Sequence, residues 1–144
     1  MATQLAYLQS GASTVLFSGE LDSLANNSLR LATADYVNGS GYVGCEVEYR
    51  GASAQSYLAN TAVSIWFLRG VVSGTYEDGA SGFQPARPPD VVLPVVSGSV
   101  RTTRVTQMPP GAVRPLFKND GTGVSLASSG NLVRMLPFTY QSFP

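Results

Sequence analysis

The chain has no histidine, one cysteine, few charged residues and no long apolar run. The absence of histidine removes the usual general base and the commonest metal ligand. The single cysteine, Cys45, excludes an internal disulfide and any cysteine-rich zinc site. Without histidine to activate it, Cys45 is expected to act as a small buried hydrophobe and not as a nucleophile. We therefore expect no enzyme, no bound metal and no cofactor.

Charge is equally scarce, since only 12% of the 144 residues are charged, against about 25% in an average soluble protein. Nine basic and nine acidic residues cancel, which leaves no electrostatic footprint for nucleic acid. No run approaches the 18 or so apolar residues of a membrane span. The first nine residues lack the basic and apolar regions of a secretory signal, so none is expected. Ser, Thr, Gly and Asn make up a third of the chain and predict a neutral surface rich in hydroxyl groups.

Glycine, proline and Asx turn signals recur along the whole chain and leave runs of roughly 6 to 10 residues between them. This spacing is typical of strands in a sandwich or barrel. The clearest strand covers residues 41–50, where Val43, Cys45 and Val47 alternate with Glu46 and Glu48. Period two places the apolar set on the core and the carboxylates in water.

Residues 62–69 form a run that is apolar on both faces. Ile65 and Phe67 share one face, while Trp66 and Leu68 share the other. Such a strand is either central and covered on both sides, or part of an interface.

Further strands are expected over 15–17, 28–34, 91–96, 100–107, 112–119 and 131–140, and one helical turn over 20–25. Pro94 indicates an edge strand or a bulge, and Pro115 and Pro137 indicate edge strands, because proline donates no ladder hydrogen bond. Together these signals predict one all-β domain, an antiparallel β-sandwich of about eight strands. The expected core residues are Val43, Cys45, Val47, Tyr49, Val63, Ile65, Phe67, Leu93, Val95, Val105, Leu116, Leu132 and Met135.

The expected organisation is an N-terminal arm over residues 1–12, which orders when it binds a neighbour, and a single sandwich domain over residues 13–144. Residues 74–89 are too long for a plain turn, and loops of that length are usually functional or disordered.

Four motifs suggest chemistry, and each has a simpler structural reading. Residues 39–44 match G-x-G-x-x-G, but a turn precedes them and a strand follows, whereas a dinucleotide site needs a strand and then a helix. Glu46 and Glu48 are a carboxylate pair, as glycoside hydrolysis requires, yet their strand face is expected to be solvated. Glu77, Asp78 and Asp90 are candidate calcium ligands, although they do not follow the EF-hand spacing. The aromatic residues Tyr57, Trp66, Tyr76 and Phe83 are a candidate sugar-stacking platform or a protein interface.

The order of several segments resembles a family of small virion structural proteins of tailed bacteriophages. These segments are ELDSLAN (20–26), IWFLR (65–69), GTYEDG (74–79), MPPGAVRPLFKNDGTG (108–123) and LASSGNLVRMLPFTYQ (126–141). The likeness covers residues 20–140, and its specificity lies in the ordered set. It implies a sandwich of jelly-roll type within a virus particle, and it brings no catalytic residue with it.

Two functions follow as expectations. The first is a capsid decoration, or cement, protein that is made in the bacterial cytoplasm and binds the exterior of the virion. Its partners are the major capsid protein and further copies of itself, as a homotrimer, and it bridges adjacent capsomers. The alternative is a receptor- or glycan-binding module of a head fibre or tail, with Tyr76, Phe83 and Asp78 as the suspected residues. An enzyme such as a depolymerase is the weakest reading. The expected partner contacts are Leu5, Tyr7, Leu8, Trp66, Tyr76, Phe83 and Arg87.

Overall fold

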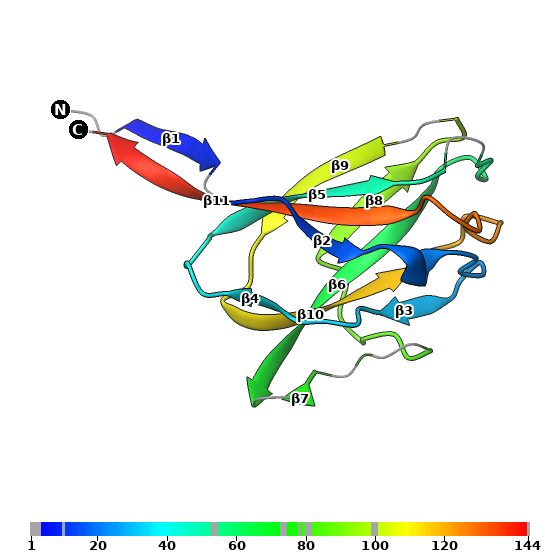
Figure 1. Ribbon diagram of the computed structural model, residues 1–144, viewed down its shortest axis with the longest axis horizontal. Helices are drawn as coiled ribbons and strands as arrows, with labels where there is room; N and C mark the ends of the chain where they lie inside the picture. The colour runs from blue at the N-terminus through cyan, green and yellow to red at the C-terminus, as the bar shows by residue number, and fades with distance from the viewer. Residues whose placement is uncertain are drawn as a thin grey trace.

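Two antiparallel sheets pack face to face in the computed structural model, which describes residues 4–9, 11–52, 55–72, 75–77, 79, 82–98 and 101–143 (Figure 1). Sheet A contains β1 (Gln4–Gln9), β2 (Thr14–Phe17), β5 (Gly44–Arg50), β9 (Arg101–Gln107) and β11 (Leu132–Phe143). Sheet B contains β3 (Leu29–Leu31), β4 (Tyr36–Asn38), β6 (Thr61–Val72), β7 (Thr75–Tyr76), β8 (Val91–Val95) and β10 (Gly111–Lys118). A 3₁₀ turn lies at Gly19–Leu21. The predicted β-sandwich is confirmed, with eleven strands among the described residues instead of about eight.

The main core lies between the sheets and follows the period-two pattern of the sequence. On β5, Cys45, Val47 and Tyr49 are buried at 2% exposure or less, and they alternate with half-buried Glu46 and Glu48. The Phe117 ring of sheet B lies 5.7 Å from the Tyr49 ring and 5.8 Å from the Phe17 ring of sheet A. Fully burying one such side chain contributes about 1.5–3 kcal/mol to the free energy of unfolding.

Most of the expected core residues are confirmed, and two are wrong. Val43 is 46% exposed because β5 begins one residue later, at Gly44, so strand alternation does not reach it. Val105 is 64% exposed because it pairs with Glu46 and lies on the outer face of sheet A. Leu132 is only half-buried, and Leu116 is buried in a second cluster described below.

Strand β6 is central and covered on both faces, as one of the two sequence readings predicts. Ile65 and Phe67 face the main core, whereas Trp66 and Leu68 form a second buried cluster with Leu116 on the outer side of sheet B. The segment between β7 and β8 covers this cluster. A Cβ atom on Gly79 would lie 2.8 Å from the Leu68 side chain and 3.1 Å from Pro85, so glycine is needed for this close approach.

One guanidinium group holds the covering segment against β6. Arg87 donates to Glu77 through Nε (3.0 Å) and Nη2 (2.6 Å), to Asp90 through Nη1 (2.8 Å), and to the Phe67 carbonyl through Nη2 (2.9 Å). The two carboxylates accept β6 backbone N–H groups in turn, Asp90 from Phe67 at 2.7 Å and Glu77 from Arg69 at 3.0 Å. We call Glu77, Arg87 and Asp90 the Arg87 clamp. It stabilises a segment whose described residues lie mostly in turns and bends, with few ladder partners.

Only one of the three prolines within strands lies in an edge strand of a sheet. Pro94 lies in β8, which pairs with β6 alone, so the edge prediction is confirmed there. The same prediction is wrong for Pro115 and Pro137, because β10 and β11 are central strands.

Pro115 and Pro137 each lie where a central strand stops pairing with one neighbouring strand and starts pairing with the next. Strand β10 pairs with β4 over residues 111–113 and with β3 over 116–118, and Pro115 lies in the gap. Strand β11 pairs with β2 over 133–135 and with β1 over 138–143, and Pro137 lies in that gap. The Pro115 carbonyl accepts from Ala32 on the side of the gap, so the missing N–H costs no ladder bond there.

Introducing a charge into the core next to β6 is expected to abolish folding. Phe67→Asp places a carboxylate at a fully buried position, where an unpaired charge costs several kcal/mol. The measurement is soluble yield and the thermal melt. The control is Val92→Asp, because the Val92 side chain on β8 is 46% exposed. A Phe67→Asp protein that melts cooperatively like the control would contradict the placement of this face.

The Arg87 clamp predicts a pH dependence of stability. Hydrogen bonds from Arg87 hold the pKa of Glu77 below its usual range, and the Arg69 N–H lowers it further, although burial opposes both. A lowered folded-state pKa contributes stability above the unfolded value of about 4.3 and loses it as the pH falls. Glu77→Gln should therefore lower the melting temperature by a few degrees at pH 7, and the difference from wild type should narrow as the pH falls below about 4.3 and through the lowered folded-state pKa. Glu46→Gln is the control, and a Glu77→Gln deficit that stays constant from pH 7 down to pH 2 would contradict the prediction.

Candidate interaction surface

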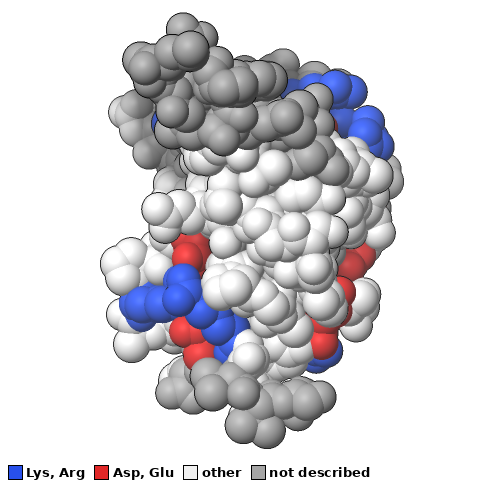
Figure 2. Space-filling model, turned by 90° about the vertical axis from the view of Figure 1, so that its left-hand side faces the viewer, with Lys and Arg blue, Asp and Glu red and all other residues white. Residues whose placement is uncertain are grey.

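Four stretches without any charged residue meet at one end of the sandwich. They are residues 4–9, 36–45, 105–113 and 135–143, and none of the nine basic and nine acidic residues falls in them. Strand pairing brings them together: β1 pairs with β11, Phe138 pairs with Gly44, Gly44 pairs with Gln107, and Gly111 pairs with Asn38. We call the surface of these four stretches the uncharged end. Figure 2 looks at this side and shows white surface across its middle, with charged side chains in its lower half and at its upper right.

Backbone hydrogen bonds join the loops of the uncharged end into one unit. The Val43 N–H donates to the Phe138 carbonyl at 3.1 Å, and the Met108 N–H donates to the Val43 carbonyl at 3.1 Å. The Phe138 ring packs on Gly44, where a Cβ atom would lie 2.3 Å from the ring. The surface is therefore built on paired strands and short, tied loops.

Asn38 is the residue that fixes these loops, and the search for functional motifs in the sequence missed it. It is 6% exposed, donates from Nδ2 to the carbonyls of Tyr42 (2.8 Å) and Pro109 (3.1 Å), and accepts the Tyr42 N–H through Oδ1 (2.8 Å). The available signal was the Asn38-Gly39 dipeptide, which is typical of a turn.

Several exposed apolar side chains belong to these stretches. Val37 and Val105 are each 64% exposed, Tyr140 is 58% exposed and Val43 is 46% exposed. Single exposed apolar residues are ordinary, but several on stretches without charge are typical of a contact surface, and the Glu46 side chain opposite Val105 lies at its border. Chemically, this surface offers van der Waals contact, backbone hydrogen bonding and little desolvation cost.

The expected contact residues fall in two separate places. Leu5, Tyr7 and Leu8 belong to β1 at the uncharged end, where their backbone pairs with β11, and their side chains lie outside the described part of the structure. Trp66, Tyr76 and Arg87 lie over the outer face of sheet B. Phe83 is 60% exposed in the segment that follows β7.

The expectation that Trp66 is exposed is wrong. Its side chain is 1% exposed, and its indole N–H donates to the Arg87 carbonyl at 3.0 Å. The covering segment encloses it within the chain, which leaves it no surface for a partner. Arg87 itself is held in the clamp.

Tyr76 is held by a polar cluster. Its hydroxyl donates to Asp35, which also accepts from Arg114 Nε at 2.5 Å, and the Arg114 guanidinium lies 5.0 Å from the centre of the Tyr76 ring. These hydrogen bonds, from Tyr76 first and Arg114 second, lower the pKa of Asp35. The ring is thus already stacked against a cation, and Asp78, the acidic member of the suggested glycan site, lies outside the described residues.

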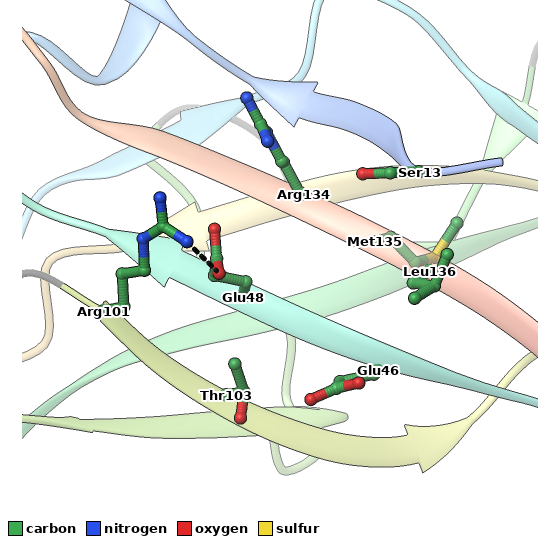
Figure 3. A pocket seen from close by; sticks show the side chains of 8 residues that line it. All are labelled: Ser13, Glu46, Glu48, Arg101, Thr103, Arg134, Met135 and Leu136. Carbon is green, nitrogen blue, oxygen red and sulfur yellow. Dashed lines mark ion pairs between the residues drawn. The ribbon is translucent and has the colours of Figure 1, made fainter.

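The carboxylate pair on β5 lies on an open sheet face. Glu46 and Glu48 line a hollow with Ser13, Arg101, Thr103, Arg134, Met135 and Leu136, and Glu48 is 3.8 Å from the Arg101 guanidinium (Figure 3). A general acid needs an apolar enclosure to raise its pKa. This hollow instead places carboxylates beside arginines, an arrangement that neutralises charge across the sheet face.

The remaining motifs have structural roles. Glu77 and Asp90 do converge, as the calcium reading required, but the Arg87 guanidinium lies between them. No cluster of metal-ligating residues occurs in the part of the chain that the structure describes. Residues 39–44 lead into strand β5 and not into a helix, which leaves no dinucleotide fingerprint. Burial raises the pKa of the Cys45 thiol to about 12, so it is not a thiolate at neutral pH.

Comparisons with protein-family models, curated proteins and solved structures give no match for the chain. Among the described residues, no helix is long and apolar enough to cross a membrane.

The uncharged end depends on Asn38 for its shape. Asn38→Ala leaves the Pro109 carbonyl and the Tyr42 backbone groups without their partner, which should lower the free energy of unfolding by about 1–3 kcal/mol. Chemical denaturation measures this loss, and Gln107→Ala, an exposed amide on β9, is the control with little expected effect. Equal stability of the two variants would contradict the anchoring role of Asn38.

Proposed function

We propose that this chain is a virion structural protein, a capsid decoration protein that binds the outside of a major capsid lattice and bridges adjacent capsomers. The observation that carries the proposal is the uncharged end, with exposed Val37, Val43, Val105 and Tyr140. The resemblance of the ordered sequence segments to small virion proteins of tailed bacteriophages supports it from a separate direction.

The physical mechanism is adhesion through a neutral surface. Charges resist desolvation, so a permanent contact forms most readily where charge is absent. A stable contact of this kind buries at least about 1,000 Å² in total for each pair of proteins. The uncharged end supplies apolar side chains on a paired-strand base for such a contact.

Self-association would strengthen binding to the capsid. A homotrimer, the expected state, presents three copies of the same surface to the lattice, and each bound subunit holds the others at high effective concentration. The chain acts by shape and contact in this proposal and carries out no reaction.

The decisive experiment compares two valines of equal exposure. Val37→Asp places a charge on the uncharged end, whereas Val96→Asp places the same charge just after β8; the two side chains are 64% and 65% exposed. Capsids that lack the protein are mixed with each variant, and bound chain and the temperature of capsid rupture are measured. Wild type and Val96→Asp should bind and raise the rupture temperature, and Val37→Asp should bind at least about tenfold more weakly.

Two results would refute the proposal. One is wild-type chain that neither binds capsids nor changes their rupture temperature. The other is Val37→Asp binding as tightly as Val96→Asp, which would remove the uncharged end as the contact. Binding of a host polysaccharide by chain that ignores capsids would favour the receptor-binding alternative.

A further inference from the structure

The end of β11 and the whole of β1 form a two-stranded ribbon that leaves the sandwich. Strand β5 pairs with β11 only as far as Phe138, whereas β1 pairs with β11 from Phe138 to Phe143. Figure 1 shows this ribbon projecting from the body, with both chain ends at its far end. We call Gln4–Gln9 with residues 138–143 the ribbon.

The ribbon has a defined root. Gly11 and Pro137 face each other there, since a Cβ atom on Gly11 would lie 2.5 Å from the Pro137 ring. This is also where β11 changes its partner from β2 to β1. The root fixes where the ribbon leaves the body, and beyond Phe138 the strand β11 no longer pairs with β5.

Both long edges of the ribbon lack a ladder partner in the described part of the chain. Strand β1 pairs with β11 alone, and residues 139–143 of β11 pair with β1 alone. Unpaired strand edges present rows of N–H and C=O groups that readily accept another strand. An isolated pair of strands is also only marginally stable in water, so a third strand would stabilise the ribbon.

Other edge strands of this chain carry features that block such pairing. Strand β9 carries Arg101 and Arg104, β8 carries Pro94, and β3 is three residues long and carries Arg30. Charge, proline and shortness are the usual protections of sheet edges. The ribbon has none of them, since its strands pair over six residues and contain neither a charged residue nor a proline.

The absence of charge also indicates which partner fits. A surface that meets an identical copy places equal charges near each other, so a charged patch of one sign opposes self-association. The ribbon carries no charge, and it is the part of the uncharged end that joins the rest through Phe138, which pairs with Gly44. A second copy of this chain therefore meets no like charge on the ribbon itself.

We propose that the ribbon is the self-association element of this protein, and that it pairs edge to edge with the ribbon of a second copy to form a shared sheet. The inference deepens the proposed function and rests on its self-association part. It assigns that contact to the ribbon, makes it a pairwise contact between two copies in place of the homotrimer, and leaves the valines of the uncharged end to the capsid.

The first test measures the mass of the full chain in solution by light scattering over a concentration series. Wild type should be larger than a monomer in the low micromolar range. Ala6→Lys adds an edge charge at the middle of β1 and should weaken association at least about tenfold. Thr103→Lys adds the same charge to the already protected edge strand β9 and should associate like wild type. A wild type that stays monomeric at about 100 µM, or Ala6→Lys with wild-type mass at every concentration, would overturn the proposal.

A second test does not depend on the folding of a charged variant. Ala6→Cys and Gln141→Cys place a thiol at paired positions on the two strands of the ribbon. The native Cys45 is fully buried and does not compete. Under mild oxidation at least one of the two variants should give a disulfide-linked dimer, and the one that does identifies the pairing edge. Thr103→Cys is the control and should stay uncrosslinked, and a failure of both ribbon variants to crosslink would overturn the proposal.

These tests use isolated protein without capsids, so the two proposals fail separately. A monomeric chain that still binds and stabilises capsids overturns the ribbon contact and leaves the decoration function. A ribbon-linked oligomer that ignores capsids supports the ribbon contact and overturns the decoration function.

Discussion

Strand β6 is apolar on both faces, and this constraint determines much of the fold around it. A sandwich normally buries one face of each sheet and leaves the other in water, so Trp66 and Leu68 need a cover of their own. The segment between β7 and β8 supplies that cover, and a cover with few ladder bonds needs polar anchors. The Arg87 clamp provides them and turns two carboxylates toward the β6 backbone. Glu77 and Asp90, which are candidate cation ligands in the sequence, thus hold the covering segment against strand β6.

The second organising feature is the replacement of one neighbour by another along each central strand. Strand β10 passes from β4 to β3 at Pro115, and β11 passes from β2 to β1 at Pro137. A residue without an N–H group tolerates such a gap, because no partner is present to accept the bond. In sheet B the change stays within the sandwich, whereas in sheet A it lets β1 and β11 leave the body together. The ribbon therefore follows from the same change of pairing partner at a proline that occurs within sheet B.

Sequence reasoning captured the period-two strands well and the environment of single residues less well. The all-β sandwich and the burial of Val47, Tyr49, Ile65 and Phe67 were predictable, because alternation within a strand reports the face directly. Val43 and Val105 were wrong because their faces depend on where β5 begins and on the β5–β9 register, both set by tertiary pairing. The uncharged end was not predictable, since its four stretches are far apart in the chain and only strand pairing joins them.

The distribution of charge connects the fold to the proposed adhesion. Asp35, Glu77, Asp90 and Asp120 form ion pairs with Arg114, Arg87 and Lys118 around sheet B, where they fix loops and the outer cover, and Glu48 pairs with Arg101 on the open face of sheet A. With only 18 charged residues in the chain, assigning so many to internal structure leaves the four stretches of the uncharged end without any. An end without charge loses little hydration when another protein covers it, and the paired strands beneath it limit the conformational entropy that binding removes. Scarcity of charge, which at first only excludes functions, is thus the property that makes a lasting contact physically favourable.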